Sequence, residues 1–184
     1  MSAIRQKQTF NTDQLETVNN AVAMSEELVS NHYKMSASQW LRPKYDVKTL
    51  AELSSHEIVE GPFAQVVRYM GKRHGSQLGS RTYDFYKICL QDHAILSALH
   101  QNDQLKLLPF TIYIVAHELV HIVRFSRFLQ SFDASAEEKL VEEARVHRET
   151  QNILGQLQLV GLKAVLEFYS TWQQPLEDLQ SPLH

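Results

Sequence analysis

The stretch 109–129 limits the possible folds of this chain more than any other part. It reads PFTIYIVAHELVHIVRFSRFL and contains no helix-breaking residue after its first position. Proline is tolerated in the first turn of a helix, so Pro109 is compatible with a helix that starts here. A helix that is apolar on nearly all sides has to be buried. We therefore expect 109–129 to be a central helix around which the other elements pack.

Length and composition indicate a single soluble domain. The 184 residues are enough to form a core without cross-links, and 43% of them are hydrophobic while 21% are charged. The formal net charge of -3 leaves no basic surplus, so we expect neither nucleic acid nor a membrane as a partner. The single cysteine, Cys89, excludes an internal disulfide and paired CxxC metal sites, and we expect it to be a small buried residue.

No segment resembles a targeting or membrane sequence. The first residues, MSAIRQKQTFNTDQ, lack the apolar core of a signal peptide. The most apolar run, 107–116, is interrupted by Pro109 and Thr111 and is shorter than the roughly 18 residues of a membrane span. We expect a cytoplasmic protein, and the sequence gives no prediction of its oligomeric state.

Local patterns predict an α+β fold that is mostly helical. Apolar spacing predicts helices over 11–31, 135–154 and 162–172, and the aromatic-rich segment 82–90 is typical of a strand. Periodicity leaves 63–70 and 94–99 open between strand and helix. As one domain over 1–184, the chain then has a helical N-terminal part (1–55), a small sheet (56–108), helices carrying the candidate metal ligands described below (109–174) and a loose tail (175–184).

Residue types at the helix ends support these boundaries. Asn11, Thr12 and Asp13 are candidate N-caps of the first helix, and Ser135 with Glu138 forms a capping-box pattern before the helix that runs to 154. Asp46 is expected to open a short helix over 46–53. The basic stretch 71–81, GKRHGSQLGSR, is expected to be a solvated loop.

The sequence HELVH at 117–121 lies inside the predicted central helix. His117 and His121 are four residues apart, so both imidazoles project from one face of the helix. Two imidazoles placed in this way can bind one Zn²⁺ at about 2.0–2.1 Å each. Glu118 is placed to take a proton from a metal-bound water. Buried polar residues are costly without partners, so this context favours a metal over a chance match.

A catalytic zinc site needs a third protein ligand. The metzincin pattern would require Gly at 124 and His at 127, where this chain has Arg124 and Arg127. On the next helix, Glu143 and His147 share a stripe with Leu140, Ala144, Gln151 and Leu154. We therefore expect Glu143 to be the third ligand of one zinc ion per chain. Glu142 and then His147 are the next candidates, and the wider set also includes Asp133, Glu137 and Glu138.

This pattern resembles the gluzincin branch of the zincin metallopeptidases over 117–147. In that branch, HExxH lies on an active-site helix and a glutamate ligand lies on a second helix, which matches Glu143. An acidic residue usually follows that glutamate by four positions, and here the position is His147. The resemblance implies a peptidase in which Glu118 and His147 are catalytic. His147 would either accept a hydrogen bond from a ligand imidazole or contact the substrate oxyanion.

The resemblance also implies how a peptide or protein substrate would bind. The active-site helix would lie under a small twisted sheet whose edge strand holds the substrate backbone by main-chain hydrogen bonds. That edge strand would come from 82–99. Two alternatives stay open. One is a non-catalytic zincin-like protein with a structural or regulatory zinc, in which His147 or His184 is a fourth ligand or the tail fills the cleft. The other is a di-iron carboxylate protein that uses Glu118-x-x-His121.

Other candidate residues favour ordinary structural roles. Arg124 and Arg127 are expected to extend to solvent or to pair with Glu137 and Glu138. The remaining candidates are expected to lie in loops, at the surface or at the rim of the core: His93, His100, Tyr83, Tyr86 and Tyr169.

Overall fold

The fold is described by a computed structural model, which covers residues 7–40, 45–72, 82–127, 129–171 and 179–180. It is α+β and mostly helical, as predicted. The elements in chain order are α1 (Thr12–Tyr33), α2 (Ala37–Trp40), β1 (Tyr45–Lys48), η1 (Leu50–Glu52), η2 (Ser55–Glu57), β2 (Ala64–Lys72), β3 (Thr82–Leu90), α3 (Asp92–Gln101), α4 (Leu107–Ser126), α5 (Ala136–Leu154), α6 (Leu162–Thr171) and β4 (Leu179–Gln180).

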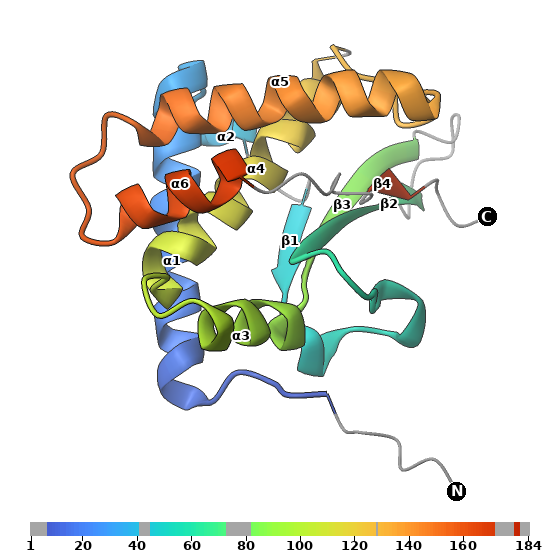
Figure 1. The fold of residues 1–184 in the computed structure, drawn as a ribbon. Helices are drawn as coiled ribbons and strands as arrows, with labels where there is room; N and C mark the ends of the chain where they lie inside the picture. Colours follow the sequence, from blue (N-terminus) through green and yellow to red (C-terminus); the bar gives the residue numbers. More distant parts are fainter. Residues whose placement is uncertain (1–6, 41–44, 73–81, 128, 172–178, 181–184) are drawn as a thin grey trace, which may run out of the picture.

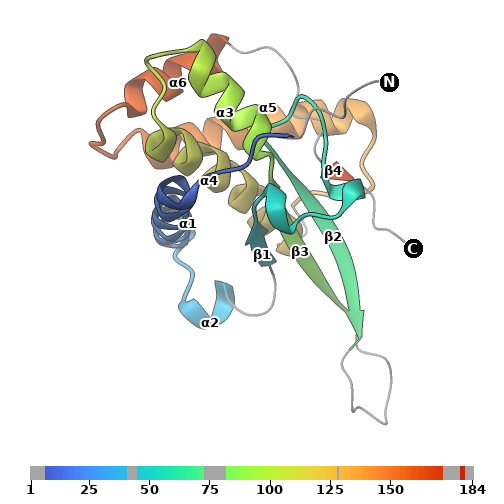
Figure 2. The same ribbon diagram turned by 90° about the horizontal axis from the view of Figure 1, so that it is seen from below.

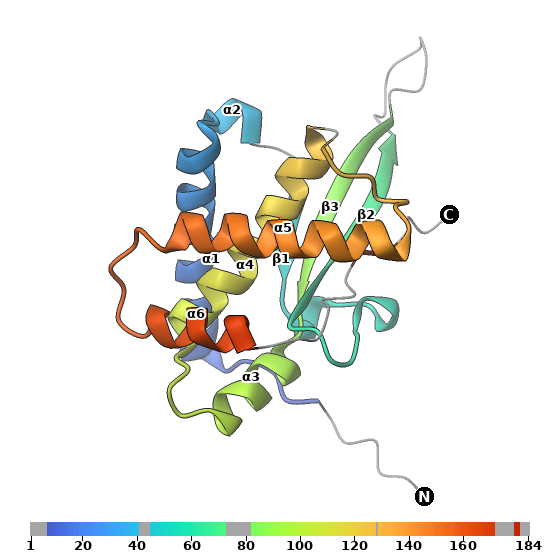
Figure 3. The same cartoon turned by 45° about the horizontal axis from the view of Figure 1, so that its top comes forward.

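Helix α4 is the centre of the molecule, which confirms the central helix predicted at 109–129, although the helix begins at Leu107 and already ends at Ser126. Every residue from Pro109 to Phe125 is buried. The long helix α1 packs along one side of α4 and the sheet covers another, and α5 and α6 cross over a third (Figures 1, 2 and 3). The helix begins at Leu107, so Pro109 is its third residue and still lies in the first turn, where a backbone N–H is not needed.

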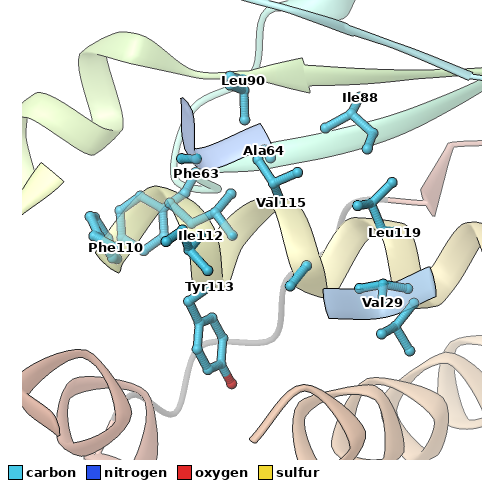
Figure 4. Close-up of a cluster of buried hydrophobic side chains, with 14 of the residues drawn as sticks. Val29, Phe63, Ala64, Ile88, Leu90, Phe110, Ile112, Tyr113, Val115 and Leu119 are labelled. Carbon is cyan, nitrogen blue, oxygen red and sulfur yellow. The ribbon is translucent and has the colours of Figure 1, made fainter. Parts of the chain in front are cut away.

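The core between α4 and the sheet is built from side chains that the two elements point at each other. Ile88 and Leu90 of β3 face Val115 and Leu119 of α4 (Figure 4). Tyr113 points to the opposite side of α4, toward the C-terminal helices (Figure 4). Because α4 is enclosed on several sides, residues on different faces of this helix meet different elements.

The helix boundaries are set by the capping residues that the sequence suggests. Asn11 caps α1 in a capping box with Gln14, and Ser135 and Glu138 form the reciprocal capping box of α5. Helix α6 confirms the prediction for 162–172, and α3 resolves 94–99 as helical.

The sheet has the strand order β1-β3-β2-β4. Strands β2 and β3 form an antiparallel pair from Ala64↔Leu90 to Lys72↔Thr82, which confirms the strand at 82–90 and shows that 64–70 is a strand. Strand β1 is parallel to β3, and β4 is parallel to β2 through Val66↔Leu179 and Val67↔Gln180. The sheet therefore extends beyond the predicted 56–108 at both ends, and part of the tail at 175–184 is a strand.

Two predictions about the sheet are wrong. The segment 46–53 is not a helix: Tyr45–Lys48 pairs with β3, and only Leu50–Glu52 forms a short 3₁₀ turn. A helix of this length is marginal by itself, so the ladder of hydrogen bonds to β3 decides its conformation. Strand β3 is also not an edge strand, because it lies between β1 and β2. Of the loop expected at 71–81, Gly71 and Lys72 belong to strand β2 instead, and 73–81 lies outside the described residues.

Helix α4 also has the length and hydropathy of a membrane span. An 18-residue stretch of this helix has a mean hydropathy of 1.3, and 89% of that stretch is buried inside the protein. The prediction that no stretch is long and apolar enough to span a membrane is therefore wrong by length and composition alone, because Pro109 and Thr111 lower the mean hydropathy too little to exclude it. The core helix of a soluble protein meets the same criteria. The cytoplasmic location and the absence of membrane and nucleic-acid partners stay predictions.

A buried carboxylate stabilises the face of the sheet opposite α4. Glu57 accepts hydrogen bonds from Lys87 Nζ at 2.6 Å, from the Ser54 backbone N–H at 2.8 Å and from the Tyr69 hydroxyl. Burial alone would raise the pKa of Glu57, but the bonds from Lys87, Tyr69 and Ser54 outweigh it and lower the pKa from 4.5 to about 2. The ionised form of Glu57 therefore stabilises the folded protein.

Replacing Glu57 by glutamine should lower the free energy of unfolding by roughly 3 kcal/mol near neutral pH. Because the folded-state pKa lies below the unfolded value, this contribution is complete above pH 4.5 and declines as the pH falls toward 2. Urea unfolding of both proteins between pH 7 and pH 3 would measure the difference. A difference that stays constant over this range would contradict the assignment.

Candidate metal centre

His117 and His121 lie at the centre of α4 and are almost completely buried, with 1% of each residue exposed. Their Nε2 atoms are 3.2 Å apart, so the helix presents both imidazoles to one point. The Nδ1 atom of His121 lies 3.1 Å from Gln130 Oε1. Because this oxygen can only accept, Nδ1 carries the proton of neutral His121, and Nε2 keeps its lone pair for a cation.

Glu143 of α5 closes the arrangement. Its Oε1 lies 2.7 Å from His121 Nε2, and its Oε2 lies 3.2 Å from His117 Nε2. Ligands at about 2.0–2.1 Å from a tetrahedral zinc would be about 3.3 Å from one another. The two imidazole nitrogens and the carboxylate thus have nearly the spacing of three ligands of one ion.

The electrostatics of this cluster require a positive charge. Burial alone would raise the pKa of Glu143, but His121 and His117 hold it far below its ordinary value. Burial would lower the pKa of His121, but Glu143 outweighs it and raises the pKa to about 9. Without a metal, a proton on the His121 imidazole balances the buried carboxylate. A metal cation at the same place would displace that proton.

Glu142 does not reach this cluster, although it is the neighbour of Glu143 and is equally buried. It forms an ion pair with Arg124 of α4, and its Oε2 accepts from Arg145 at 3.3 Å. The prediction that Arg124 extends to solvent or pairs with Glu137 or Glu138 is therefore wrong. Arg127 is exposed, which agrees with the first of its two predicted outcomes, and it lies over the ring of Tyr33 at 5.1 Å.

The buried face of α5 also differs from the predicted stripe. Leu140 is 53% exposed and Ala144 is exposed, whereas the side chains that face the core are Glu142, Glu143, Val146, Thr150, Ile153 and Leu154. Glu143 lies on this buried face, but the apolar residues used to locate it only partly do. The exposed leucine misled the prediction, because single exposed apolar residues are common on protein surfaces.

His147 lies one turn after Glu143 and is the most exposed member of the cluster, with 25% of its side chain accessible. Its Nε2 is 4.0 Å from Glu143 Oε2, and its ring centre is 4.3 Å from that of His117. One donor atom from each of His117, Glu143 and His147 lies within 4.8 Å of the others. Burial lowers the pKa of His147 to about 3, with the charge of His117 acting in the same direction, so the ring is neutral.

A tyrosine fixes the orientation of His147. The hydroxyl of Tyr113, one turn before His117, is 2.8 Å from His147 Nδ1, and its ring stacks on Tyr169 at 3.9 Å. Burial raises the pKa of Tyr113, so the phenol keeps its proton. Among the described residues, Nδ1 of His147 is the acceptor for the hydroxyl proton of Tyr113. The ring proton of neutral His147 is then on Nε2, which faces the cluster.

Glu118, which follows His117 on α4, is only 2% exposed. Its Oε2 has no hydrogen-bond partner among the described residues, and neither does Nδ1 of His117. Burial raises the pKa of Glu118, while His117 and His121 act to lower it. A buried carboxylate with a raised pKa and a free oxygen is suited to take and return a proton.

Sequence reasoning missed Tyr113 and Gln130. Tyr113 precedes His117 by four residues, so its helical spacing was a usable signal. Gln130 follows α4 in a turn, and no sequence signal pointed to it.

The other candidate residues whose side chains the structure describes are not part of the metal cluster. Tyr86 stacks on Phe125 at 5.9 Å, and Asp133 and His100 are exposed. His93 lies near Glu60, away from the cluster. Cys89 is buried, as predicted, and burial raises its pKa to about 12. Tyr83 and His184 have side chains outside the described residues.

No family model, no curated protein and no solved structure matches this chain. The function therefore has to be inferred from the cluster itself.

Proposed function

We propose that the protein is a zinc-dependent hydrolase that cleaves peptide bonds with a water activated by Glu118. The observation that carries this proposal is the position of the Glu143 carboxylate, 2.7 Å and 3.2 Å from the Nε2 atoms of His121 and His117. Three donors of zinc-binding type converge there from two helices, and both histidines belong to an HExxH motif. In this proposal α4 is a zincin-like active-site helix and α5 is the second ligand helix of a gluzincin-like peptidase.

The residues fit the steps of such a reaction. His117, His121 and Glu143 would hold the zinc, which when bound supplies a Lewis acid for the substrate carbonyl and for water. Glu118 would take a proton from the attacking water and give it to the leaving amine. His147 would donate its Nε2–H to the carbonyl oxygen as negative charge develops on it. The 25% exposure of His147 places it where this buried cluster meets solvent.

Metal content and hydrolysis together test the proposal. Protein purified without added metal should contain about one zinc per chain by elemental mass spectrometry, and should cleave a quenched-fluorescent peptide library. A chelator should abolish cleavage and stoichiometric zinc should restore it. Two metal ions per chain would favour the di-iron alternative instead. No metal after zinc is supplied would overturn the proposal.

A second candidate is a non-catalytic protein with a structural or regulatory zinc. It is favoured by the closeness of His147 to His117 and Glu143, because a fourth protein ligand would fill the coordination sphere. The bond from Tyr113 argues against it, because Nε2 of His147 then carries a proton and has no free lone pair.

Tyr113→Phe separates the two candidates. If His147 is a hydrogen-bond donor, loss of the Tyr113 hydroxyl allows the ring proton of His147 to move from Nε2 to Nδ1. The kcat should then fall about tenfold while zinc content and KM stay the same. If His147 is a zinc ligand, the variant should bind zinc as tightly as the wild type or more tightly, and neither protein should turn over peptides. Zinc titration and steady-state kinetics measure the two outcomes. Tyr69→Phe, which removes a hydroxyl on the opposite face of the sheet, is the matched control.

A further inference from the structure

Arg68 of β2 is a partly buried cation on the side of the sheet that faces α4. In the ladder it is the partner of Tyr86, whose ring is 5% exposed and stacks on Phe125. The Arg68 guanidinium lies 4.6 Å from the ring centre of Phe132, which is buried. Stacking on an aromatic ring holds a guanidinium in a defined place.

Within the described part of the chain, Arg68 forms no ion pair and its buried Nε has no hydrogen-bond partner. Asp84, which is diagonal to Arg68 in the ladder, does not come within ion-pair distance of the guanidinium. Arg124, by comparison, is also buried but pairs directly with Glu142. A partly buried arginine without a partner favours a planar anion that can accept two hydrogen bonds, and a carboxylate is such a group.

Arg68 is connected to the metal centre by a short row of rings. The Phe132 ring is 4.7 Å from that of Phe125, and Phe125 stacks on His121 at 6.2 Å and 22°. Three side-chain contacts thus separate the guanidinium from a proposed zinc ligand. An extended peptide advances about 3.3 Å per residue, so the distances between these rings correspond to only a few residues of extended chain.

Strand β2 also offers the backbone along which such a peptide would lie. One edge of β2 pairs with β3 over its whole length. On the other edge, β4 pairs with Val66 and Val67, and among the described residues no strand pairs with this edge from Arg68 onward. This is the stretch to which an added strand would form main-chain hydrogen bonds.

We propose that Arg68 binds the carboxylate of an acidic side chain of the peptide substrate, a few residues from the bond that is cleaved. This inference rests on the proposed function, because it assigns the substrate class of the same site. Arg68 determines specificity and takes no part in proton transfer. It should therefore affect which peptides bind, and it should not affect the zinc.

Peptide binding to full-length, zinc-loaded Glu118→Gln protein tests this without requiring turnover. The probes are fluorescein-labelled octapeptides with one glutamate moved through an alanine background, each with a glutamine counterpart. Fluorescence anisotropy should show about tenfold tighter binding of the glutamate peptide at one position. Adding Arg68→Gln should abolish this preference, and Arg68→Lys should restore only part of it because lysine lacks the planar fork. Lys163→Gln, which removes an exposed charge on α6, should leave it unchanged.

The outcomes separate this inference from the proposed function. A glutamate preference that survives Arg68→Gln, or no preference at any position, overturns the role of Arg68 alone. If glutamate peptides bind selectively through Arg68 but the wild-type protein cleaves none of them, the role of Arg68 in carboxylate binding is supported and the peptidase proposal is overturned. If no peptide binds, both are overturned. Zinc content equal to the wild type verifies that the Arg68→Gln protein is folded, and Arg68→Lys serves in its place if it is not.

Discussion

Replacing Glu118 by glutamine should lower kcat by about 10²–10⁴-fold while the zinc stays bound. Glutamine has nearly the shape of glutamate, so it fits a residue that is only 2% exposed. It cannot take a proton from water, however, and this is the role proposed for the free Glu118 oxygen. Because the substrate contacts of the rest of the site are kept, peptide binding should change little.

The measurement combines single-turnover kinetics with zinc analysis of the same protein sample. Gln130→Ala is a useful comparison, because it removes a partner of His121 and should weaken zinc binding about 10–100-fold without removing the base. Equal rates for Glu118→Gln and the wild type would show that Glu118 is not the base. Loss of zinc in Glu118→Gln would instead indicate that Glu118 is a ligand.

The second large effect is expected at Glu143. Glu143→Gln should reduce bound zinc from about one ion per chain to a small fraction, because an amide oxygen carries no charge and the two imidazoles alone bind zinc weakly. Cleavage should be lost together with the metal. Zinc titration monitored by isothermal calorimetry would give the loss in affinity directly.

Glu142→Gln is the matched control for this experiment. Glu142 and Glu143 are adjacent, 8% and 7% exposed, and each is paired with a cation or with histidines. If the assignment is right, Glu142→Gln keeps its zinc and is only less stable, because Arg124 loses a charged partner. Loss of zinc in Glu142→Gln with retention in Glu143→Gln would reverse the two roles.

The sequence predicted the central helix and the histidines on it because both depend on local spacing. The run 109–129 has no breaker, and residues four apart on a helix always share a face. Glu143 of α5 was harder to predict as a ligand, because the orientation of its side chain depends on how α4 and α5 pack against each other. The side chains that fix it, Arg124 on α4 and Tyr113 beside His147, act across 18 and 34 positions of the chain.

The sheet shows the same limit more clearly. The strand at 82–90 has enough aromatic and β-branched residues to be recognised alone. Strand β1 has four residues and forms only because β3 provides a parallel partner. That pairing makes β3 an inner strand, and the order β1-β3-β2-β4 leaves β1 and β4 as the outer strands of the sheet. Strand order depends on contacts between distant segments, which local patterns do not encode.

The pairing of Leu179–Gln180 with Val66–Val67 has a practical consequence for expression. Strand β4 lies beside the stretch of β2 where we expect peptides to bind. A histidine-rich affinity tag placed after β4 would compete with the protein for the metal and would be tethered close to this stretch. Activity and metal content should therefore be measured on protein from which such a tag has been removed.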